Sequence, residues 1–118
     1  MNCTLAFAIV ALGVDLFVSP LQADELSEYG AYLSSECTTC HRSVYTENAA
    51  PSLDGQTSVE IVNKLASFKS GQRANAVMQN IAARLTEDEI EALAAHYSSL
   101  PRPAGCLEGD ASANKERC

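Results

Sequence analysis

Residues Cys37-Thr38-Thr39-Cys40-His41 decide how this chain is organised. In a helical segment, residues three and four positions after Cys37 lie on the same face, so the two thiols and the imidazole come together. Two such thiols can form thioethers with the two vinyl groups of a porphyrin, and the adjoining imidazole can bind its iron. The motif therefore predicts one covalently attached haem, with Cys37 and Cys40 as attachment points and His41 as an axial ligand.

Two other chemistries use cysteine pairs at this spacing. A redox dithiol normally lies in a βαβ context, and no such pattern surrounds Cys37. A zinc site could use both cysteines and His41, but zinc ligands are usually spaced apart, whereas His41 directly follows Cys40. Haem attachment is favoured over both alternatives, which stay open at this point.

The first part of the chain has the composition of an export signal. An apolar run from Leu5 to Val14 precedes Pro20-Leu21-Gln22-Ala23 and the acidic Asp24. The run is shorter than the about 20 apolar residues that a membrane span needs. We therefore expect residues 1–23 to be a signal peptide and the protein to be periplasmic, without a membrane span. Because no Lys or Arg precedes the run, a retained N-terminal anchor is the alternative.

Two further cysteines would then lie in an oxidising compartment. We expect Cys106 and Cys118 to form a disulfide that closes the segment between them into a loop, and two free thiols are the alternative. The chain has 118 residues, which is enough for one domain. The expected organisation is a signal peptide over residues 1–23, a domain over 24–101 and a tail over 102–118.

The charge of the chain limits its partners. Fifteen acidic residues against eight basic ones give a formal net charge of −7 at pH 7. Nucleic acids and anionic membranes are poor partners for such a protein. A basic or neutral protein surface is a better one.

Apolar periodicity predicts an all-α fold, and no segment has the pattern of a strand. The expected helices are residues 25–36, residues 57–71 with a capping box at the start, a short helix within 73–84, and residues 86–100 with a second capping box. The chain has only four Tyr, three Phe and no Trp. A core so poor in large side chains would gain an apolar centre from a buried porphyrin.

The second axial ligand decides whether the iron transfers electrons or binds small ligands. Met78 is the only methionine besides Met1, so a His/Met site must use it, although a methionine among apolar residues is often ordinary core filling. His96 is the rival ligand, and a flanking, partly exposed role fits it better. An open iron would indicate a haem enzyme or sensor, but no catalytic constellation in the sequence supports that reading.

Several stretches together resemble the class I c-type cytochromes. They are Cys37–His41, Pro51–Gln56, Val77–Met78 and Ala94–Tyr97. A narrower likeness, carried by residues 51–56, 65–71 and 77–82, is to the cytochrome subunits of flavocytochrome c sulfide dehydrogenases and their small monohaem relatives.

The resemblance implies a small class I cytochrome c fold and a role for each matching residue. His41 and Met78 would be the axial ligands, and the Pro51 carbonyl would accept a hydrogen bond from the ring nitrogen of His41 that faces away from the iron. Gly30 would contact Tyr97 where two helices cross. Arg42 departs from the family, which often has glycine after the motif.

The expected function is periplasmic electron transfer through one haem c, with redox proteins as partners and no catalytic activity of its own. The alternative is a haem subunit bound to a sulfide-oxidising flavoprotein dehydrogenase.

Overall fold

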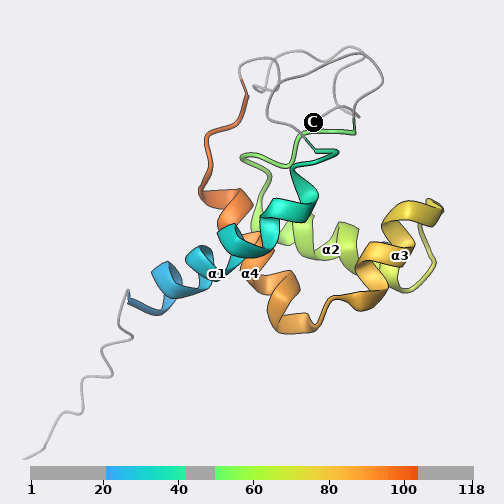
Figure 1. Cartoon of the computed structure of the whole chain (residues 1–118), viewed down its shortest axis with the longest axis horizontal. Coiled ribbons are helices and arrows are strands. Elements are labelled where there is room, and N and C mark those ends of the chain that lie inside the picture. Colours follow the sequence, from blue (N-terminus) through green and yellow to red (C-terminus); the bar gives the residue numbers. More distant parts are fainter. Residues whose placement is uncertain (1–20, 42–49, 104–118) are drawn as a thin grey trace, which may run out of the picture.

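The computed structural model describes residues 21–41 and 50–103 (Figure 1). These residues form four helices and no strand, which confirms the all-α fold class. The helices are α1 (Leu21–Cys37), α2 (Ser58–Lys69), α3 (Ala76–Arg84) and α4 (Glu87–Ser99). Residues 1–20, Arg42, Cys106 and Cys118 lie outside the described part of the chain.

Helices α1 and α4 cross closely (Figure 1). Gly30 of α1 is buried at their contact. A Cβ atom at this position would overlap the backbone carbonyl of Ala92 and would lie 2.8 Å from the Cβ of His96. Only glycine lets the two backbones approach this far. The expected helix crossing is therefore present, although the closest atoms of α4 belong to Ala92 and His96 rather than to Tyr97.

Helices α2 and α4 begin with the capping boxes expected from the sequence. The Thr57 hydroxyl accepts a hydrogen bond from the Glu60 N–H at 3.3 Å, and the Glu60 carboxylate accepts one from the Thr57 N–H at 2.8 Å. Thr86 and Glu89 make the same pair of bonds at 3.2 and 2.7 Å. Each box satisfies two N–H groups that a helix start would otherwise leave without partners.

The helix ends also follow the sequence. Gly71 has φ of +76°, the left-handed conformation that closes a helix, and it follows the end of α2. Helix α4 ends at Ser99, just before Pro101. Helix α1 is longer than expected, because it begins at Leu21 rather than at residue 25.

The core lies where α2 and α4 meet and where α1 and α4 cross. Its buried members are Ile61, Leu93, Ala94 and Tyr97, with Leu33, Cys37, Leu53, Val62, Leu65, Leu85 and Leu100 packed partly buried against them. Helix α3 packs on α2. Tyr29 is four positions before Leu33 in α1, a spacing that puts both on one side of the helix, yet Tyr29 is 44% exposed. Among the described helices, none is both long and apolar enough to cross a membrane.

Candidate haem-binding site

The motif residues lie at the C-terminal end of α1 and in the turn that follows it. The helix ends at Cys37, but the His41 N–H still donates a hydrogen bond to the Cys37 carbonyl at 2.8 Å, and the Cys40 N–H donates to the same carbonyl at 3.2 Å. These bonds continue the helical i, i+3 and i, i+4 spacing for one more turn. Cys37 and His41 are half-buried, Cys40 is exposed, and both thiols are free.

His41 is held by the loop that precedes α2. Its Nδ1–H donates a hydrogen bond to the Pro51 carbonyl at 2.6 Å. This bond fixes the ring orientation and selects the tautomer of the neutral imidazole in which Nε2 carries a lone pair that can bind a metal. The contact is the one that the family resemblance implied.

Met78 lies in the first turn of α3. Asn75 caps this helix, and its side-chain oxygen accepts a hydrogen bond from the Met78 N–H at 3.0 Å. The cap fixes the start of α3 and thus the position of the Met78 backbone. The Met78 side chain is half-buried.

A cavity of about 700 Å³ brings these residues together. Its lining includes all five residues predicted from the sequence: Cys37, Cys40, His41, Pro51 and Met78. Apolar side chains from the loop before α2 and from each of the helices α2, α3 and α4 form much of the remaining wall. They are Leu53, Ile61, Leu65, Phe68, Ile81 and Leu93. The volume lies within the range of about 300–1,000 Å³ that is typical of sites for small molecules and cofactors.

Polar groups in this cavity show the effect of the apolar surroundings. Burial raises the pKa of the Cys37 thiol, and a contact with Tyr97 opposes this only in part. Burial also raises the pKa of Tyr97, and the neighbouring Cys37 adds to the shift. The Tyr97 hydroxyl is buried, and no group in the described part of the chain meets hydrogen-bond geometry with it. Both groups thus remain neutral near pH 7.

The residues fit a c-type haem in chemistry as well as in volume. A haem needs two thiols for covalent attachment, an imidazole with one free ring nitrogen and an apolar surrounding, and this cavity offers all three. A zinc ion needs three or four ligands that converge on one point. No such group of His, Cys, Asp and Glu side chains exists among the described residues. The zinc alternative therefore has no support in the structure.

His96 lies away from this cavity. It lies next to the α1 crossing and lines a separate, shallow depression with Asp24 and Glu28. His41 is the only histidine among the described residues that line the large cavity. Met78 thus shares the large cavity with His41, and His96 does not.

Sequence reasoning missed Gln56 and Lys64, which also line the cavity. Lys64 falls outside the apolar stripe of α2, so its spacing predicts a solvated lysine. The structure instead has it half-buried, with Nζ 2.6 Å from Gln56 Oε1. A hydrogen bond between a loop and a helix has no signature in local periodicity, so no pattern in the sequence could have indicated it.

Comparison with known proteins identifies relatives that carry two different names. Cytochrome c-553 of Helicobacter pylori (strain ATCC 700392 / 26695) is 30% identical over 95 residues, which cover 78% of this chain and 95% of the relative. A thiosulfate dehydrogenase electron acceptor of Stutzerimonas stutzeri (strain A1501) is 39% identical over 70 residues, 57% of this chain and 32% of the relative. A protein of the same name from Thiomonas intermedia (strain K12) is 34% identical over 90 residues, 71% of this chain and 42% of the relative.

The chain spans less than half the length of the two electron acceptors, but it covers nearly all of the cytochrome c-553. No protein-family model matches it. The extent of the cytochrome c-553 match shows that the chain belongs to the family of monohaem c-type cytochromes. These relatives do not favour the alternative of a subunit of a flavoprotein dehydrogenase.

Proposed function

We propose that this protein transfers electrons in the periplasm and carries one haem c, attached through Cys37 and Cys40 and ligated by His41 and Met78. The observation that carries the proposal is the convergence of these four side chains and Pro51 on one largely apolar cavity. They come from the end of α1, the following loop and the start of α3. Ordinary core packing gives no reason for two thiols, an imidazole and a thioether to share one cavity.

When bound, the haem supplies one-electron chemistry between ferric and ferrous iron. The protein attaches it, orients its ligands and excludes water from it. Pro51 orients His41 through the 2.6 Å hydrogen bond, and the cap at Asn75 positions Met78. The apolar wall disfavours the extra charge of the ferric state, so both the wall and a thioether ligand would raise the reduction potential.

The partners that we propose are redox proteins. Two relatives are named as electron acceptors of thiosulfate dehydrogenase, which supports a dehydrogenase as the electron donor. For the organisation of the chain we propose a signal peptide over residues 1–23, the haem domain over 24–101 and a tail over 102–118. Reduction of the ferric protein by thiosulfate and a purified thiosulfate dehydrogenase, but not by thiosulfate alone, would identify the donor.

The central test is expression in a host that attaches haem to exported cytochromes. Wild-type protein should retain one haem through acid–acetone extraction. Cys37→Ala removes one of the two attachment thiols, so at most one thioether can hold the haem in that variant. The ferric wild type should have the weak near-infrared sulfur-to-iron band. Met78→Ala should lose this band and have a lower reduction potential, because a thioether ligand favours ferrous iron.

Asn80→Ala is the matched control for Met78. Asn80 is exposed on the same helix and does not line the cavity. It should leave the band and the potential unchanged. Freely extractable haem in the wild type would refute covalent attachment, and a near-infrared band that survives Met78→Ala would refute ligation by Met78.

A further inference from the structure

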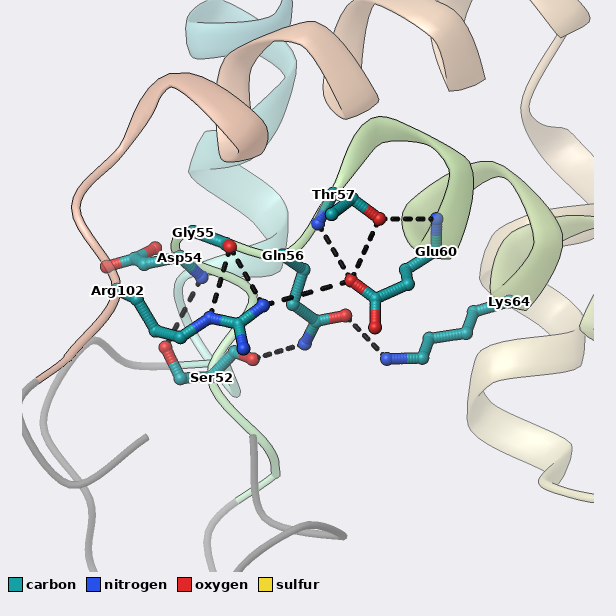
Figure 2. A network of polar contacts seen from close by, with 8 residues as sticks. All are labelled: Ser52, Asp54, Gly55, Gln56, Thr57, Glu60, Lys64 and Arg102. Atoms are coloured by element: carbon teal, nitrogen blue, oxygen red, sulfur yellow. Dashed lines mark hydrogen bonds and ion pairs between the residues drawn. The ribbon is translucent and has the colours of Figure 1, made fainter. Parts of the chain in front are cut away.

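The loop of residues 51–56 is held from inside by a chain of hydrogen bonds that starts on α2 (Figure 2). Lys64 Nζ donates to Gln56 Oε1 at 2.6 Å, and Gln56 Nε2 donates to the Ser52 carbonyl at 2.5 Å. Gln56 is only 3% exposed, so these bonds form largely out of water. Burial lowers the pKa of Lys64, and a partly buried ammonium of this kind is stabilised by an acceptor such as the Gln56 oxygen.

A second set of contacts holds the same loop from outside. Arg102 Nε and Nη2 donate to the Gly55 carbonyl at 3.2 and 3.0 Å, and Nη2 lies 3.8 Å from the Glu60 carboxylate (Figure 2). The Gly55 N–H donates to the Tyr97 carbonyl at 2.9 Å. Gly55 has φ of +69°, and a Cβ there would lie 2.6 Å from the Arg102 backbone. The loop is therefore fixed between α2, α4 and the segment after α4.

These contacts fix the loop that carries the Pro51 carbonyl. The Pro51 oxygen lies in the peptide unit between Pro51 and Ser52, and the Ser52 carbonyl lies in the next unit, joined to it through the Ser52 Cα. A Ser52 carbonyl held by Gln56 therefore anchors the neighbouring unit and limits how far the Pro51 oxygen can move. That oxygen accepts the 2.6 Å hydrogen bond from His41 Nδ1. A firmly placed acceptor on the far side of a ligating imidazole raises its basicity and strengthens its donation to a metal.

We propose that Gln56, supported by Lys64, is a positioning residue that holds the Pro51 carbonyl against His41 and thereby lowers the reduction potential of the haem iron. This inference rests on the proposed function, since it needs a haem on His41. A stronger imidazole donor favours ferric iron, whereas the apolar wall and the thioether favour ferrous iron. The Lys64–Gln56–Ser52 hydrogen bonds would therefore shift the reduction potential towards the value that a strong imidazole donor favours.

Gln56→Leu tests the inference because it removes the hydrogen bonds to Lys64 and Ser52 without changing the charge of the protein. Two properties of the holoprotein are measured: the reduction potential and, in the ferrous state, the exchange rate of the His41 Nδ1 hydrogen by NMR. We expect a higher potential in the variant. We also expect exchange about tenfold faster, which corresponds to ~1.4 kcal/mol in the free energy of opening the retained His41–Pro51 hydrogen bond.

Thr86→Ala is the control for general loosening. It removes a capping box like that of Thr57 from α4, and it leaves the loop untouched. It should lower stability while both haem properties stay at wild-type values. Equal shifts in Thr86→Ala and Gln56→Leu would overturn the inference, and so would wild-type exchange and potential in Gln56→Leu.

A second pair of variants applies if Gln56→Leu yields no folded holoprotein. Lys64→Met removes the supporting ammonium, and Lys69→Met removes a lysine of the same helix that bonds to Leu85 and Glu87 instead. Faster His41 exchange in Lys64→Met alone supports the inference, and equal rates in both overturn it. A wild type without covalent haem overturns the proposed function as well, whereas a normal wild type with an unresponsive His41 overturns only the inference.

Discussion

Substitution of Gly30 by alanine tests the closest helix contact in the structure. The added Cβ would overlap the Ala92 carbonyl and lie 2.8 Å from the Cβ of His96. Carbon atoms in ordinary contact are about 3.5–4.0 Å apart, so the His96 contact alone requires α1 and α4 to separate by about 1 Å, and the Ala92 overlap requires more. Neither obstacle can swing aside, because one is backbone and the other is the first atom of a side chain.

The expected cost follows from two opposing effects. Overpacking of a close contact destabilises by about 1–3 kcal/mol, and a clash with the backbone of a second helix belongs at the upper end. Alanine regains about 1 kcal/mol because it is a better helix former than glycine. The net loss of unfolding free energy is about 2 kcal/mol. For a domain of this size, that loss lowers the midpoint of thermal unfolding by about 8–16 °C.

The measurement is thermal unfolding of the holoprotein followed by far-ultraviolet circular dichroism. Ser35→Ala is the control, since Ser35 is exposed on the same helix and its replacement should change stability by less than about 0.5 kcal/mol. A Gly30→Ala protein that unfolds at or above the wild-type temperature would refute the close crossing, because the gain in helix propensity would then be the only effect.

Three further predictions concern the cap of α2, the tail and the export signal. Hydrogen bonds from Thr57 lower the pKa of Glu60 in the folded state, so its contribution to stability is present above the ordinary pKa of 4.5 and lost as the pH falls through the lowered value. Denaturant unfolding should therefore give a stability difference between wild type and Glu60→Gln at pH 7 that shrinks toward pH 3. Alkylation of Cys106 and Cys118 without reduction should label neither, and a labelled thiol would contradict the disulfide. N-terminal sequencing of the exported protein should begin at Asp24, and an intact Met1 in the membrane fraction would favour the anchor.

The parts of the fold that sequence predicted are those that local physics determines. A capping box involves residues only three positions apart, so Thr57 with Glu60 marks the start of α2 without knowledge of anything else. The motif works in the same way, because Cys37, Cys40 and His41 come together within one helical turn. Helical spacing alone does not separate Tyr29 from Leu33, yet Tyr29 is 44% exposed and Leu33 packs against the core.

The parts that sequence could not predict depend on contacts between distant segments. Arg102 follows the last helix and is the first residue of the segment that we expected to be a tail. Its side chain nevertheless donates a hydrogen bond to the Gly55 carbonyl, 47 positions earlier in the chain. Gln56 lies in a stretch that the family resemblance already marked, but neither spacing nor composition indicates that its amide faces inward to Ser52.

The site therefore combines two kinds of information. The residues that would bind iron and haem are recognisable one by one, since thiols, imidazole and thioether are rare and chemically distinctive. The residues that would adjust the reduction potential of the iron are of common types, namely glutamine, lysine and arginine. Their role can be recognised only from their contacts in the folded chain. Because the Pro51 carbonyl is an acceptor that any residue would supply, its importance comes from the side chains that hold it in place. A relative that keeps the motif but lacks a counterpart of Gln56 or Lys64 should accordingly bind haem equally well and have a higher reduction potential.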